Sequence, residues 1–195
     1  HPYRTGIVTL LDALTLVSES QGEDFMSMKL RIRKFQAGDE ESLRKNINDV
    51  EVARNTLIIP YPYTKNDARK WIRHNLRLSK KRKPEEVNFA IDIEGEVVGG
   101  IGLARINRTD NNAEIGYWLA REYWKRGIMT KAVRQIAKFG FEKLKLKRIY
   151  AYVFVSNRAS KRVLNKAGFE LEGKMKKCKL KKKKYYDAFL YAKIK

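Results

Sequence analysis

The stretch Glu114–Ala132 constrains the fold more than any other, because it joins a strand pattern to a helix pattern through a short loop. Its first part predicts a strand, and apolar residues at helical spacing predict a helix near Thr130–Leu144. Gly127 stands in the loop, directly after Lys125 and Arg126. Free N–H groups at a helix start attract anions, and glycine lets an anion approach the main chain closely. The pattern alone indicates either an anion-binding loop or the commoner case, an ordinary strand-to-helix turn; the GxxxxGK[ST] spacing of a P-loop is absent.

The rest of the chain alternates between strand and helix patterns, and this order predicts an α/β domain with one mixed sheet flanked by helices. Asp39 and Thr64 are expected to cap the first two helices. Strands are predicted at Leu30–Arg33, Val87–Ile93, Val97–Ile106, Ala113–Leu119, Arg148–Val155, Phe169–Lys174 and Tyr185–Ile194, and helices at Asp39–Ala53, Lys65–Ser79, Thr130–Leu144 and Ala159–Ala167.

The composition fits a single globular domain. A chain of 195 residues with 43% hydrophobic residues can bury one sizeable core. Its 43 Lys and Arg against 22 Asp and Glu give a net charge of +21, which favours acidic partners and makes a polyamine substrate less suitable. One Cys and two His predict neither a disulfide framework nor a metal site. No apolar run is long enough to span a membrane, so we expect a cytoplasmic protein.

Residues 1–28 read differently from the rest. An apolar stretch, Ile7–Val17, is followed by a polar one, Ser18–Asp24, without the charge and cleavage pattern of a signal peptide. We expect an N-terminal extension that is dispensable for activity, whether vector-derived, disordered or upstream of a start at Met26 or Met28. The alternative is a short helix that docks on the domain or on a second subunit.

A second motif, Asn157–Phe169, follows a predicted strand at the distance needed to face the Gly127 loop. Together the two motifs resemble the GNAT superfamily of acetyl-CoA-dependent N-acetyltransferases. More narrowly they resemble its Rim-type branch, which acetylates N-terminal amines of ribosomal proteins and has the approximate pattern EIGYWL…YWGKGYATEA, then N…S…VLEKAGF…EG. The resemblance extends from about Leu30 to Ile194 and includes Tyr61–Ile72. The matching residues are Glu114, Ile115, Gly116, Tyr117, Trp118, Leu119, Tyr123, Trp124, Gly127, Thr130, Ala132, Asn157, Ser160, Val163, Leu164, Lys166, Ala167, Gly168, Phe169, Glu172 and Gly173.

The resemblance implies a GNAT fold over residues 29–195, with a mixed, mostly antiparallel central sheet flanked by helices. It implies acetyl-CoA as cosubstrate, no metal, and direct transfer in a ternary complex. The family usually has Gly at the position of Lys125 and Gly or Ala at that of Met129, which leaves a loss of cofactor binding open. Leu164 replaces a tyrosine that many members use as a general acid, as it does in the Rim-type branch. The residues expected to bind acetyl-CoA are Trp118, Leu119, Lys125, Arg126, Gly127, Ile128, Met129, Thr130 and Asn157.

Acetyl transfer requires that an amine lose a proton and that the leaving thiolate gain one. An α-amine has a pKa near 7.7–8.0 against about 10.4 for lysine, so deprotonating a lysine at pH 7 costs about 3.5 kcal/mol more. A weak base therefore suffices for an α-amine, and we expect Glu114 to be that base. The alternative for Glu114 is a surface carboxylate paired with a lysine.

The resemblance implies two further catalytic groups. Ser160 is expected to protonate the thiolate, and a backbone N–H near Leu119 to bind the oxyanion. The alternative for Ser160 is a hydroxyl at a helix start. Asn157 is expected to bond the pantetheine arm of the cosubstrate, to cap the short helix, or to do both.

Aromatic and basic residues suggest where the acceptor binds. Tyr61, Tyr63, Trp71 and Tyr117 either line the acceptor pocket or, as is more common, pack in the core. The run Lys174–Lys184 predicts a solvated loop or an electrostatic guide for an acidic protein or ribosomal RNA.

We therefore expect an acetyltransferase whose acceptor is the N-terminal amine of a protein, first of all an acidic ribosomal one. Two alternatives remain: acetylation of a small-molecule amine, and a catalytically weak GNAT-like module that binds the ribosome or nucleic acid. Formation of a homodimer is left open.

Overall fold

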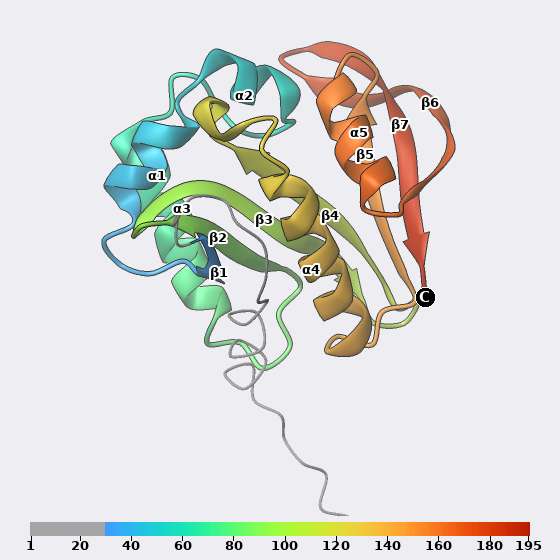
Figure 1. The fold of residues 1–195 in the computed structure, drawn as a ribbon, viewed down its shortest axis with the longest axis horizontal. Helices are drawn as coiled ribbons and strands as arrows, with labels where there is room; N and C mark the ends of the chain where they lie inside the picture. The colour runs from blue at the N-terminus through green and yellow to red at the C-terminus, as the bar shows by residue number, and fades with distance from the viewer. Residues whose placement is uncertain (1–29) are drawn as a thin grey trace, which may run out of the picture.

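The computed structural model describes residues 30–195, so the expected extension 1–28 lies outside the described residues. One seven-stranded sheet has the order β1-β2-β3-β4-β5-β7-β6 (Figure 1). All neighbouring strands pair antiparallel except β4 and β5, which pair parallel, so the mixed, mostly antiparallel sheet is confirmed. The strands are β1 (Leu30–Lys34), β2 (Val87–Ile93), β3 (Glu96–Asn107), β4 (Asn112–Leu119), β5 (Arg148–Phe154), β6 (Glu170–Lys181) and β7 (Lys184–Ile194).

Helices cover both faces of the sheet (Figure 1). Val133 and Ile136 of α4 belong to one cluster of buried apolar residues, and Leu43 of α1 and Ile72 of α3 belong to a second. The helices are α1 (Glu40–Ile47), α2 (Val50–Asn55), α3 (Lys65–Leu78), α4 (Ile128–Glu142) and α5 (Arg158–Lys166), with a 3-10 helix, η2, at Arg121–Tyr123.

Strand β4 divides its side chains between the two faces. Ile115 and Leu119 pack in the cluster under α4, whereas Trp118 packs in the cluster of α1 and α3. Because side chains alternate along a strand, Glu114 and Gly116 share the face of Trp118. This face carries part of the site described below.

The single helix expected from Asp39 to about Ala53 is wrong, because this segment forms α1 and α2. The side chain of Asp49 accepts hydrogen bonds from the N–H groups of Glu51 and Val52 and starts a second helix. The apolar periodicity alone predicted one helix, but a capping residue within the pattern divides the segment into two helices.

Asp39 does not cap α1 with its side chain, contrary to expectation. Its carboxylate accepts hydrogen bonds from the guanidinium of Arg33 at 2.8 and 2.9 Å. The same guanidinium donates to the carboxylate of Asp92 at 2.7 Å. Both carboxylates are buried, so the network ties β1 and β2 to the start of α1.

The lysine-rich run Lys174–Lys184 is not a loop, contrary to expectation. Strand β6 continues through it to Lys181, and Lys182–Lys183 form the turn into β7 with φ values of 46° and 63°. The segment is a strand because β7, already paired with β5, offers it a row of backbone groups. Since β6 is the edge of the sheet, most of its lysines still reach solvent.

Candidate active site

The site begins where β4 and β5 separate. Their parallel pairing extends only from Asn112 with Arg148 to Glu114 with Tyr150, although both strands continue. A cleft of about 930 Å³ opens there and is lined from both halves of the sheet. Every residue expected to bind acetyl-CoA borders this cleft.

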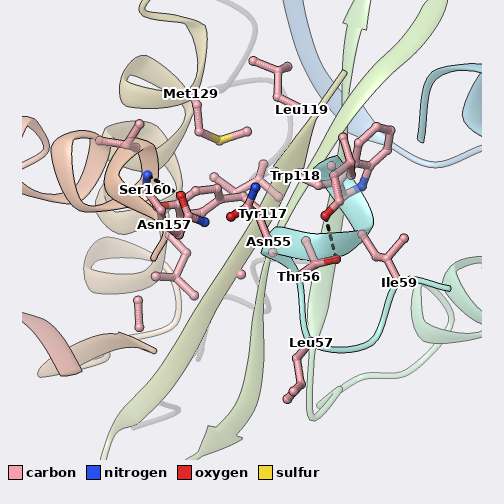
Figure 2. A pocket seen from close by; sticks show the side chains of 18 of the residues that line it. Asn55, Thr56, Leu57, Ile59, Tyr117, Trp118, Leu119, Met129, Asn157 and Ser160 are labelled. Carbon is pink, nitrogen blue, oxygen red and sulfur yellow. Dashed lines mark hydrogen bonds between the residues drawn. The ribbon is translucent and has the colours of Figure 1, made fainter. Parts of the chain in front are cut away.

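Figure 2 shows how the cleft is bounded. Asn157 and Ser160 lie on one side, and the segment from Asn55 to Ile59 lies on the other, with Tyr117 between them. The cleft therefore joins elements from distant parts of the chain.

One end of the cleft is the start of α4. Gly127 is the N-cap, with φ of 75°, and has no side chain to occupy the free amides of the first turn. The first bond of the helix runs from Lys131 N–H to Gly127 C=O at 3.1 Å, which leaves the preceding amides for another acceptor. With the charges of Lys125 and Arg126 beside them, these amides suit a phosphate-bearing ligand.

The middle of the cleft holds a hydrogen bond between the two halves of the domain. The hydroxyl oxygens of Tyr117 and Ser160 are 2.6 Å apart. Burial raises the pKa of Tyr117 well above its ordinary value, so its hydroxyl stays protonated. The N–H of Ser160 donates to Asn157 Oδ1 at 3.0 Å, so Asn157 does cap α5.

Glu114 borders the cleft at the last position of β4 that pairs with β5. Its carboxylate lies 3.5 Å from the guanidinium of Arg105, and its side chain is 22% exposed. The ionic partner is thus an arginine of the adjacent strand. A partly solvated carboxylate in this position can accept a proton from a bound amine, directly or through water.

The sequence of residues 29–170 matches the family described as the acetyltransferase (GNAT) domain. The chain belongs to the GNAT acetyltransferases. It is 29% identical over 173 residues to the uncharacterized N-acetyltransferase p20 of Bacillus licheniformis, covering 89% of this chain and 97% of that protein. It is 31% identical to the ribosomal-protein-serine acetyltransferase of Escherichia coli (strain K12), covering 67% and 72%. A solved GNAT acetyltransferase from Bacillus anthracis is 29% identical, with a TM-score of 0.73 over 85% of this chain and 94% of that one. The expected fold, family and enzyme class are confirmed.

Lys125 and Met129, the two departures of this GNAT chain from the family pattern, have different structural settings. Lys125 has φ of 64°, a left-handed conformation that explains why the family favours glycine there. The side chain of Met129 is buried in the cluster under α4 and also borders the cleft. Most of the Met129 side chain is therefore packed in the core.

The backbone at the end of β4 faces the opening. Ala120 N–H donates to Val98 C=O of β3 at 2.8 Å. Since N–H groups alternate in direction along a strand, the N–H of Leu119 is directed toward the side where β5 has separated.

The expected aromatic residues do not all reach the cleft. Tyr63, Trp71 and Tyr117 border it, whereas Tyr61 does not and is 48% exposed. Tyr63 is also a core residue, and burial raises its pKa to about 12. Its N–H donates to Asn48 Oδ1 at 2.9 Å, which fixes the loop after α2.

Sequence reasoning missed a floor of glycines on the face of Trp118. Gly102 pairs with Gly116 across β3 and β4, and Gly100 pairs with Trp118. A Cβ on Gly102 would lie 2.3 Å from Asn88 Oδ1, whereas a Cβ on Gly116 would meet nothing within 4 Å. The signal was present, because glycine inside a strand often marks the close approach of a ligand.

The cleft is also lined by an acid–base pair that the sequence did not single out. His74 Nε2 of α3 lies 2.5 Å from Glu86 Oε1, and both residues border the cleft. Within residues 30–195, no group of His, Cys, Asp and Glu side chains is arranged to hold a metal ion. No helix in the same part of the chain is long and apolar enough to cross a membrane.

Proposed function

We propose that this acetyltransferase transfers an acetyl group from acetyl-CoA to the N-terminal α-amine of a protein, with a ribosomal protein as the first candidate. The observation that carries the proposal is the cleft that runs through the separated strands β4 and β5. It joins the anion-binding start of α4 to Glu114 and the glycine floor. The E. coli relative named a ribosomal-protein-serine acetyltransferase supports this acceptor class.

Acetyl-CoA supplies a thioester for the amine to attack, and the residues at one end of the cleft fit its phosphates. The amides at the start of α4, together with Lys125 and Arg126, match phosphate in charge and in hydrogen-bond donors. Asn157 uses Oδ1 as a helix cap, so its NH₂ group is the part that binds a carbonyl of the pantetheine arm.

We assign the proton transfers to two side chains. Glu114 accepts the proton of the amine, and Ser160 donates its proton to the thiolate and regains one from water. We assign the protonated Tyr117 hydroxyl as the donor to Ser160 Oγ, an arrangement that leaves the Ser160 hydrogen free to be directed into the cleft. The Leu119 N–H stabilises the oxyanion.

The run Lys174–Lys184 forms the tip of the β6–β7 hairpin, called here the lysine-rich hairpin. Its positive charge supports an acidic acceptor. Lys176, Lys177, Lys182 and Lys183 are exposed and give this end of the molecule a positive field. We propose that the field guides an acidic ribosomal protein or the ribosomal RNA beside it. The cytoplasm is the compartment where such partners occur.

A panel of amines tests the acceptor class. We expect acetylation of a peptide with a free N-terminus, and little of the same peptide when its N-terminus is blocked and it carries an internal lysine. A preference for the free amino acid or for a polyamine would instead support a small-molecule acetyltransferase. Ribosome binding without transfer to any amine would support the non-enzymatic module. Mass spectrometry of acetylated N-termini in a lysate would then identify the acceptor.

A further inference from the structure

A row of three residues crosses the floor of the cleft from β2 to β4. Asn88 pairs with Gly102, and Gly102 pairs with Gly116. A Cβ on Gly102 would lie 2.3 Å from Asn88 Oδ1, so this oxygen occupies the space above the α-carbon of Gly102. Asn88 borders the cleft, and within residues 30–195 no group donates a hydrogen bond to its Oδ1. No buried side-chain oxygen in this part of the chain lacks a partner, so Oδ1 is accessible from the cleft.

The amide of Asn88 is held in one orientation. Its Nδ2 group donates to Glu86 Oε2 at 3.3 Å, and His74 Nε2 lies 2.5 Å from Glu86 Oε1. A carboxylate only accepts hydrogen bonds, so the NH₂ end of the amide faces Glu86 and Oδ1 faces away from it. The ring of His74 lies beside that of Trp71 on the same helix, with centroids 6.0 Å apart. These contacts from α3 to β2 therefore present a hydrogen-bond acceptor above the floor.

The spacing between Asn88 Oδ1 and Glu114 matches one residue of peptide. Gly102 pairs with Gly116, which lies two residues after Glu114 on β4. Gly102 and Glu114 are therefore diagonal neighbours, about 7–8 Å apart on one face of the sheet. Consecutive backbone nitrogens of a peptide lie about 3.5 Å apart, and an N–H···O bond spans about 2.9 Å. A peptide whose amine binds Glu114 thus brings its first peptide N–H within reach of Asn88 Oδ1.

We propose that Asn88 is a specificity-determining residue, whose Oδ1 accepts a hydrogen bond from the first peptide N–H of the acceptor and thereby selects peptides over free amino acids. This inference rests on the proposed function. A free amino acid carries a carboxylate where a peptide carries this N–H. That carboxylate meets a second acceptor, with the negative charge of Glu86 behind it, and two acceptors form no hydrogen bond. Glu86 and His74 are positioning residues that hold the amide of Asn88.

Two pentapeptides that differ at one position test the hydrogen bond directly. Both begin with alanine and have a free N-terminus, but in the second an ester oxygen replaces the first peptide N–H. We expect the wild type to prefer the amide peptide by about fivefold or more in kcat/KM, the usual worth of one such hydrogen bond. Asn88→Leu keeps the size of the side chain and removes its oxygen, so it should abolish this preference. Asn165→Leu makes the same change at an exposed residue of α5 that does not border the cleft, and should leave the preference unchanged.

His74→Phe is a second variant, which leaves Asn88 in place. It removes the partner of Glu86 and keeps an aromatic ring beside Trp71, so it should lower the amide preference by about twofold or more. A merely structural role for His74 would instead lower acetylation of both peptides equally. Free alanine is the third acceptor. The ratio of kcat/KM for the amide peptide to that for free alanine should fall in Asn88→Leu, because only the peptide loses a hydrogen bond.

The outcomes separate this inference from the proposed function. A wild type that acetylates both peptides equally would overturn the role of Asn88, as would a preference that survives in Asn88→Leu. If thermal melts show that Asn88→Leu is unfolded, the ratio in His74→Phe decides, and an unchanged ratio overturns the role. An unchanged ratio of amide peptide to free alanine would overturn the selection against free amino acids. A wild type that acetylates neither peptide would overturn the proposed function and this inference with it.

Discussion

At the scale of single residues, the contact between Tyr117 and Ser160 links β4 to α5 across the opening of the sheet. We expect Ser160→Ala to lower kcat by about 10- to 1,000-fold, within and just below the usual range for proton-transfer groups. Tyr117→Phe should lower kcat less, and should have no further effect when Ser160 is already alanine, because it acts through that hydroxyl. Steady-state kinetics of the two single variants and the double variant measure this. Equal losses from Tyr117→Phe in both backgrounds would show a purely structural role.

Gly127 carries the corresponding prediction for acetyl-CoA binding. A ligand that binds only the folded state raises the Tm, so millimolar acetyl-CoA should stabilise the wild type. Gly127→Asp should abolish the shift, because it places a carboxylate where the phosphates bind. Gly127→Asn is the matched control, since it tolerates the same backbone conformation and adds no charge. Thermal melts with and without acetyl-CoA decide the matter, and an unshifted wild type would contradict the assigned cosubstrate.

At the scale of elements, β4 places Gly116 in the glycine floor of the cleft, where we propose that the acceptor binds. A Cβ there meets nothing within 4 Å, so Gly116→Val should leave stability unchanged or slightly raised. The added side chain fills space that the acceptor needs, so its KM should rise about tenfold, an expectation based on the lost pocket volume. Gly116→Ala should have a smaller effect on KM. If Gly116→Val leaves the acceptor kinetics unchanged, the acceptor does not lie on this floor.

The packing of α1 against β1 and β2 depends on the buried network around Arg33. Asp39→Ala should lower the free energy of unfolding by about 3 kcal/mol, because it leaves a largely buried guanidinium with one partner fewer. Glu41→Ala removes an exposed partner of Arg44 and should change the free energy of unfolding little, because solvent screens the pair. Urea unfolding of both variants provides the comparison. If both variants lose a similarly small free energy of unfolding, the Arg33 network contributes little to stability.

At the scale of the whole molecule, a net charge of +21 gives a long-range field to which the lysine-rich hairpin contributes strongly. Replacing Lys176, Lys177, Lys182 and Lys183 with glutamine, while sparing Lys181, should reduce kcat/KM for an acidic acceptor through slower association. The loss should shrink as salt rises, since the Debye length is about 8 Å at 0.15 M. A neutral peptide serves as the control acceptor and should be acetylated at the wild-type rate. If the variant and the wild type acetylate acidic acceptors at equal rates at low salt, the hairpin contributes to solubility and not to acceptor association.

Patterns local to a few residues were enough to predict the loop at the start of α4. The strand, the Gly127 loop and the helix after it are adjacent in sequence, so their order alone placed free amides beside Lys125 and Arg126. The motif at Asn157 was equally local, and its capping bond to Ser160 spans three residues.

The sequence by itself therefore determined the family, the order of helices and strands along the chain and the glycine loop at the start of α4, because these follow from local periodicity and short motifs. Only the tertiary structure decided what distant segments do to one another. The first expected helix is divided at Asp49, and the carboxylate of Asp39 binds Arg33 instead of capping α1. The lysine-rich run Lys174–Lys184 is a strand for most of its length because it pairs with β7. The tertiary structure also brought Lys181 to α2 and Tyr117 to Ser160. These contacts join residues that are far apart in the chain. Local sequence patterns do not specify which distant groups the fold brings within hydrogen-bond distance.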